Sequence, residues 1–146
     1  MRLVANAGLL LSATLADRLG LEALIDRRVD LGERPGARRA GAKVLSLVSA
    51  MLVGGDSIDD ADVLRAGETG QLLGHRVLAP STLGTFLRSF TFGHVRQLDA
   101  VLDVTLARAW ALGAGPRGER LVIDLDSFIR EVHGYHKQGA DRKSVV

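Results

Sequence analysis

The spacing of apolar residues changes once along the chain, and this change limits the possible folds more than any other feature. Up to Leu112, apolar residues recur every three or four positions, which is the period of an amphipathic α-helix. After a Gly/Pro turn at residues 113–118, the run 120–127 alternates instead and contains β-branched residues, as strands do. We therefore predict a mainly α fold, with an N-terminal helical cluster followed by one β-strand or hairpin.

Helices are expected over residues 9–24, 43–53, 58–64, 81–90 and 95–112. Gly20 interrupts the first pattern and can divide it into two short helices. Residues 43–53 are apolar nearly all round, so this helix should be central to the core. Ser81 is a plausible N-cap, and the acidic residues 56–62 suit a helix N-terminus, although a metal site is the alternative for them. Residues 32–41 form a basic loop.

Composition excludes several classes of protein. The chain has 146 residues and no cysteine, so disulfide scaffolds, thiolate metal sites and cysteine nucleophiles are ruled out. No apolar run is long enough for a membrane helix, and the N-terminal stretch lacks a signal-peptide cleavage pattern. We expect a cytoplasmic protein with no membrane partner. The net charge is only +2, but the basic residues are mostly arginine, which binds phosphate through its planar fork.

Several basic residues flank the short central helices. Closely spaced helices of this kind can form a helix-turn-helix-like cluster, in which one helix enters the major groove of DNA. The candidates for phosphate contacts are Arg34, Arg38, Arg39, Lys43, Arg76 and Arg88. The alternative is a helical bundle with a solvated basic rim.

The sharpest chemical feature is a carboxylate pair at the end of the predicted strand. Asp124 and Asp126 lie two positions apart, so they share one face of a strand and can help to hold Mg²⁺, which prefers oxygen ligands. The alternative is an edge strand whose acidic side faces solvent. His75 and His94 are isolated in sequence and are interpreted as surface or capping residues. No Ser/His/Asp arrangement is identifiable.

Four pieces of the chain, in order, resemble DDE transposases of the IS1380 family, in the IS4-like group. The first three resemble that family's N-terminal helical region: residues 43–55, DDADVLR at 59–65, and PSTLGTFLR at 80–88. The fourth, RLVIDLDSFIREVHGYHKQGA at 120–140, resembles the start of the catalytic domain, where the family carries an Asp-Leu-Asp-x-Thr strand, then Val-x-Gly and a Gln-Gly-Ala-like run.

The resemblance implies that this strand begins an RNase H-like α/β domain and that Asp126 is the first member of the Asp-Asp-Glu triad that binds Mg²⁺. Asp124 is the second choice for that role. Phe128 stands where the family has Thr, which is a departure from the pattern. The upstream helices would serve DNA binding and assembly on terminal repeats, with Arg34, Arg38, Arg39, Arg76 and Arg88 as the DNA-binding residues.

The second Asp and the Glu of the family's triad would lie downstream of residue 146. We therefore expect a transposase fragment that is inactive alone, with a helical region at 1–118 and the truncated start of an RNase H-like catalytic domain at 119–146. The competing hypothesis is a helical dimerisation or interaction module without a nucleic-acid role, in which residues 95–112 pair with a second copy of the chain. A homo-oligomer is possible under either hypothesis.

Overall fold

Helices account for most of the part of the chain that the computed structural model describes, residues 5–116, 118 and 122–126. The mainly α fold predicted from the apolar spacing is therefore confirmed. The α-helices, in chain order, are α1 (Leu9–Arg18), α2 (Leu21–Arg28), α3 (Ala40–Leu52), α4 (Ala61–Ala66), α5 (Glu68–Leu72), α6 (Pro80–Arg88) and α7 (Phe92–Ala109). A 3₁₀ turn, η1 (Ile58–Asp60), precedes α4, and a π-helical turn, η2 (Trp110–Ala114), follows α7.

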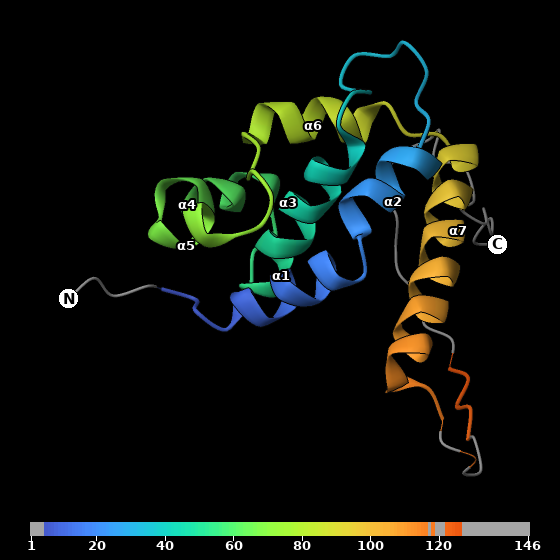
Figure 1. Cartoon of the computed structure of the whole chain (residues 1–146). Coiled ribbons are helices and arrows are strands. Elements are labelled where there is room, and N and C mark those ends of the chain that lie inside the picture. Colours follow the sequence, from blue (N-terminus) through green and yellow to red (C-terminus); the bar gives the residue numbers. More distant parts are fainter. Residues whose placement is uncertain (1–4, 117, 119–121, 127–146) are drawn as a thin grey trace, which may run out of the picture.

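Helix α3 is the centre of the arrangement, as its apolar sequence predicts. It packs against α1, α2, α4, α6 and η1. In the view of Figure 1, α4 and α5 are drawn to one side of α3, α6 above it and α1 below it. Helix α7 packs against α2 and extends past the other helices at its C-terminal end.

Two apolar clusters form the core on either side of α3. One joins α1, α3, α4 and α6 through Leu9, Ala50, Leu64 and Leu83. The other joins α2, α6 and α7, and its largest member is Phe86, which is 1% exposed. Phe86 packs edge-on against Phe90, with ring centroids 4.9 Å apart. Burial of these side chains is the main favourable contribution to folding.

The helix ends follow local sequence signals, with two differences from the prediction. Gly20 takes a left-handed conformation (φ 60°) and separates α1 from α2, as expected. Ser57 caps η1 in a capping box with Asp60. The prediction of Ser81 as a cap is wrong, because Ala79 is the N-cap of α6 and Pro80 takes its first position. Helix α7 begins at Phe92, earlier than predicted, because Thr91 forms a capping box with His94.

The predicted strand is not seen in the residues that are described. Residues 122–126 have no regular secondary structure, and side chains of both alternating sets are exposed, with Ile123 71% and Val122 80% accessible. Residues 120, 121 and 127, and the hairpin predicted over 128–138, lie outside the described residues. Over the described ranges, no helix combines the length and hydrophobicity that crossing a lipid bilayer requires.

Candidate nucleic-acid interface

The loop of residues 32–39 is fixed to the bundle by one buried cation. Lys43, on the first turn of α3, is 4% exposed, and its ammonium donates hydrogen bonds to the carbonyls of Gly36 and Arg38. It also lies over the ring of Phe86, 5.3 Å from the centroid. Burial lowers the pKa of Lys43, as does nearby Arg39, while Asp26 acts in the opposite direction. Lys43 therefore orders the loop, and its predicted contact with phosphate is wrong.

The same loop is also attached to the C-terminal end of α6. The hydroxyl of Ser89 donates to the carbonyl of Pro35 (2.6 Å), and Arg34 Nη1 donates to the carbonyl of Ser89 (2.9 Å). Arg34 Nη1 also lies 3.3 Å from Nδ1 of His94. Gly36 has φ +82° and no room for a side chain, since a Cβ would lie 3.1 Å from the backbone nitrogen of Phe86. These contacts place Arg34 next to the residue that follows Arg88.

Arg38 and Arg39 are exposed on the last residues of the loop. Arg39 is the N-cap of α3 and has a left-handed backbone (φ 58°), which is uncommon for a residue other than glycine. Both arginines line a shallow hollow of about 260 Å³ that they share with Asp26 and Asp30. Asp26 accepts a hydrogen bond from the backbone of Gly41 (2.7 Å), so its carboxylate also supports the start of α3.

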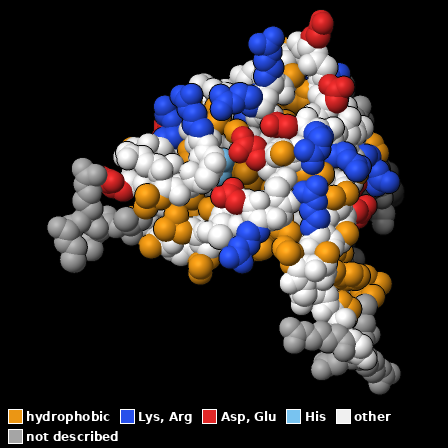
Figure 2. All heavy atoms as spheres, viewed as in Figure 1, with side chains coloured by type: hydrophobic (Ala, Val, Ile, Leu, Met, Phe, Trp, Pro, Cys, Tyr) orange, Lys and Arg blue, Asp and Glu red, His pale blue; other side chains and the backbone are white. Residues whose placement is uncertain are grey.

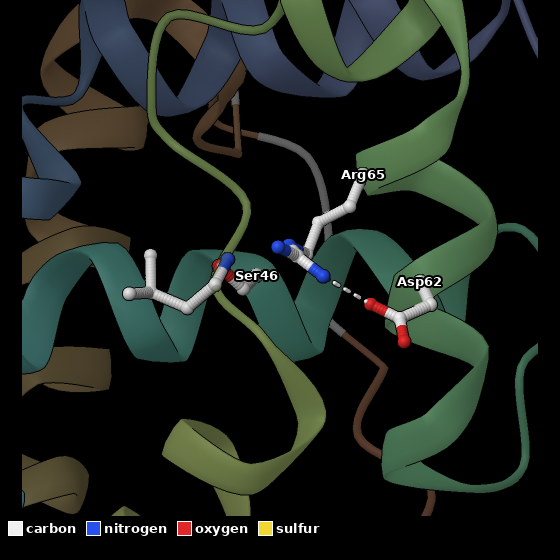
Figure 3. Close-up of polar contacts among 4 residues, drawn as sticks. Ser46, Asp62 and Arg65 are labelled. Carbon is white, nitrogen blue, oxygen red and sulfur yellow. Dashed lines mark hydrogen bonds and ion pairs between the residues drawn. The ribbon is translucent and has the colours of Figure 1, made fainter.

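Arg88, in the last turn of α6, is exposed and has one long hydrogen bond, from Nη2 to Thr85 Oγ1 (3.4 Å). It borders a polar hollow of about 450 Å³ between η1, α4 and α6. Arg65 borders the same hollow, but its Nη1 is paired with Asp62 at 2.6 Å on α4 (Figure 3). Arg88 is therefore more available to an external anion than Arg65.

Arg76 is exposed in the segment that leads into α6, away from the loop of residues 32–39. Ser46 Oγ on α3 donates to the Arg76 carbonyl (3.3 Å) and accepts from the backbone nitrogen of Leu78 (3.0 Å), so α3 holds this segment in place. Four of the five predicted arginines lie on the loop of residues 32–39 or at the end of α6 to which this loop is bonded, and we call this part of the surface the basic edge: Arg34, Arg38, Arg39 and Arg88.

Charged and apolar side chains are separated on the visible face. In Figure 2, Lys and Arg side chains lie mostly over the upper part of the molecule, whereas hydrophobic side chains gather along the lower border, over α1 and beside the projecting end of α7. Asp and Glu side chains lie among the basic ones in that upper part, so Figure 2 separates charged from apolar side chains and shows no purely basic patch.

The acidic residues near α4 have mainly structural roles. The Asp60 carboxylate accepts hydrogen bonds from the backbone nitrogens of Ser57 (2.9 Å) and Asp56 (3.1 Å) and from the hydroxyl of Ser57 (3.0 Å). These bonds lower the pKa of Asp60, because they favour the charged form. Asp62 pairs with Arg65. The capping interpretation of this cluster is confirmed for Asp60.

Asp124 and Asp126 are exposed in the segment 122–126. Mg²⁺ needs several oxygen ligands in near-octahedral geometry. Among the residues that the structure describes, no three His, Asp or Glu side chains gather closely enough to hold a metal ion. Among the described residues, Asp124 and Asp126 therefore do not form a magnesium site by themselves.

Sequence reasoning missed one contact between residues far apart in the chain. His75 is 7% exposed, and its Nε2 lies 3.3 Å from the hydroxyl of Ser49 on α3, so its interpretation as a surface or capping residue is wrong. Burial lowers the pKa of His75, while Glu22, Asp17 and a hydrogen bond to the backbone of Leu45 act in the opposite direction. No local sequence pattern predicts this pair, because the two residues are 26 positions apart. His94 does cap a helix, as predicted.

Comparison of the chain with protein-family models, with curated proteins and with solved structures finds no match.

Proposed function

We propose that the helical part of this chain binds DNA through the basic edge, as the N-terminal region of a transposase-like protein. One observation carries the proposal: the loop of residues 32–39 is held rigidly against α6 by Lys43 and Ser89, so that its arginines are presented together with Arg88. A fixed loop loses little conformational entropy when it binds, which favours the contact.

The polar side of α6 supports the same proposal. Ser81, Thr85 and Arg88 recur at four- and three-residue spacing, and Ser81 and Arg88 are exposed. Helices that enter the major groove present polar side chains of this kind to base edges and phosphates. Within the proposal, α6 faces the groove and the loop arginines contact the flanking phosphates. The resemblance of residues 80–88 to the transposase family points to the same element.

The resemblance also implies Mg²⁺-dependent strand cleavage and transfer in full-length relatives, with Asp126, or Asp124, on the first strand of an RNase H-like domain. For the chain in hand we propose binding alone, because the described carboxylates do not form a metal site by themselves.

Fluorescence anisotropy with a labelled 30-base-pair duplex, across a salt series, tests DNA binding. Four phosphate contacts predict an affinity that falls with salt with a log–log slope of up to about −4. Arg88→Gln should weaken binding and reduce the slope by about one. Arg18→Gln removes an equally exposed arginine at the end of α1 and should leave both values unchanged. Absence of binding at low salt, or equal effects of the two variants, would refute the proposal.

A second candidate function, a dimerisation module, is favoured by the projecting end of α7. Leu106 and Trp110 are 52% and 48% exposed there, although both are large and apolar. An exposed apolar patch of this kind is typical of interaction surfaces. Light scattering distinguishes the two functions: a stable dimer that Leu106→Glu dissociates, together with indifference to DNA, would favour the module.

A further inference from the structure

An apolar groove of about 470 Å³ lies between α1, α3 and α7. Its walls include Leu19, Ile25, Val44, Leu45, Leu98 and Val101. Small-molecule sites in proteins have volumes of about 300–1,000 Å³ and are lined mainly by hydrophobic side chains with a few polar groups. The volume and the lining of the groove both fit that description, and neither the sequence motifs nor the proposed DNA contacts make use of it.

The polar groups of the groove converge at one place. Ser49 and His75 both line it, and the Ser49 hydroxyl lies 3.3 Å from His75 Nε2, which is long for a hydrogen bond that involves a hydroxyl. Thr105 also lines the groove, but its hydroxyl already donates to the carbonyl of Val101 (2.7 Å). The His75 imidazole is also hydrogen-bonded to the backbone of Leu45, so within this pair it is the Ser49 hydroxyl that can take a further hydrogen-bonding partner from the groove.

The charges around this pair indicate what kind of partner fits. Asp17 and Glu22 act on the His75 imidazole electrostatically, and they place negative potential beside it. A carboxylate or phosphate in the groove would lose its hydration and meet like charges, which is costly. A neutral hydroxyl or carbonyl avoids both costs.

We propose that the groove binds a small neutral amphiphile, whose apolar body fills the space between α1, α3 and α7 and whose single hydroxyl group hydrogen-bonds to Ser49 beside His75. The volume accommodates about fifteen water-sized groups, so a ligand of roughly ten to fifteen heavy atoms fits. The site is separate from the basic edge, and either proposal can fail without the other.

Isothermal titration calorimetry of the full chain with 1-decanol, and with decanoate at neutral pH, tests the site. We expect one site per chain and tighter binding of the alcohol than of the anion. Ser49→Ala should weaken 1-decanol binding about fivefold to tenfold, the effect of one hydrogen bond. Ala16→Trp, which fills the groove from α1, should abolish binding.

Thr14→Ala is the matched control, because it removes an exposed hydroxyl of α1 that bonds to the Leu10 carbonyl and lies outside the groove. Circular dichroism verifies that each variant is folded. The proposal fails if 1-decanol does not bind up to its solubility limit, or if Ser49→Ala binds as well as Thr14→Ala. It also fails if light scattering finds a dimer that Ala16→Trp dissociates while the unmodified chain binds no alcohol, since a second copy would then occupy the groove.

Discussion

The two ends of α3 are covered in different ways. At its N-terminal end, Lys43 is buried under the loop of residues 32–39 and its ammonium donates to two carbonyls of that loop. At its C-terminal end, Met51 and Leu52 are 71% and 58% exposed although both are apolar. One helix therefore carries a buried charge at one end and exposed hydrophobic side chains at the other, which is the reverse of the usual distribution.

The two ends of α3 differ because other groups of the chain cover the charge at one end, while the apolar side chains at the other end stay uncovered. A lysine ammonium can be buried here because carbonyl oxygens and an aromatic ring replace its water. Of the two exposed apolar residues, Leu52 lines the groove, where a bound molecule would cover it. Other parts of the chain thus cover Lys43 at the N-terminal end of α3, whereas apolar side chains at its C-terminal end remain exposed.

The largest effect on the free energy of unfolding is expected near the N-terminal end of α3, where Phe86 lies under Lys43. Phe86→Ala should reduce the free energy of unfolding by about 3–5 kcal/mol, because it removes a buried ring that supports both Phe90 and Lys43. Leu87→Ala, on the exposed side of the same helix, should cost about 1 kcal/mol or less. Urea denaturation measures both. Similar losses in the two variants would mean that this end is not packed as described.

The buried cation provides the second test. Lys43→Met should cost about 1–3 kcal/mol, because the carbonyls of Gly36 and Arg38 lose their donor. The loop should also be freed, so that trypsin cleaves after Arg38 and Arg39 faster than in the unmodified chain. Arg28→Met, an exposed cation on α2, should change neither property. An unchanged cleavage rate in Lys43→Met would show that the loop is held by other contacts.

The pH dependence of stability tests the burial of His75, which lines the groove. The pKa of His75 is lowered from 6.5 by burial, so the unfolded chain binds this proton more readily than the folded chain does. The free energy of unfolding should therefore fall as pH drops from 6.5 to the lowered pKa. Urea midpoints of the unmodified chain and of His75→Gln, measured from pH 7.5 to pH 5, should diverge over that window. Parallel curves would contradict the assignment.

The smallest effect is expected at the exposed apolar residues. Met51→Gln should change the free energy of unfolding by no more than about 0.5 kcal/mol, because the Met51 side chain is already 71% exposed in the folded protein. Leu45→Ala, on the buried side of the same helix, should cost about 2–5 kcal/mol by comparison. An equal loss in the two variants would indicate that Met51 is covered in solution, as in a dimer.

Local signals in the sequence were sufficient for most of the helices. The period of apolar residues and the interruption at Gly20 act within a few residues, and each is found where it is predicted. Interactions between distant segments were not predictable in this way. The role of Lys43 depends on Phe86 and on two loop carbonyls, and the pairing of Ser49 with His75 depends on how the segment between α5 and α6 packs against α3. The prediction that Lys43 contacts phosphate rested on its charge alone, whereas in the folded protein the residue is buried.

The bond from Arg108 to the carbonyl of Leu19 has a consequence for the order of folding. It joins residues 89 positions apart and fastens α7 to the corner between α1 and α2. Contacts between α2 and α3 need only short chain closures, whereas this one must wait for nearly the whole described chain to be in place. We therefore expect α7 to dock last, onto a preformed set of helices, and to be the first helix released when the protein unfolds.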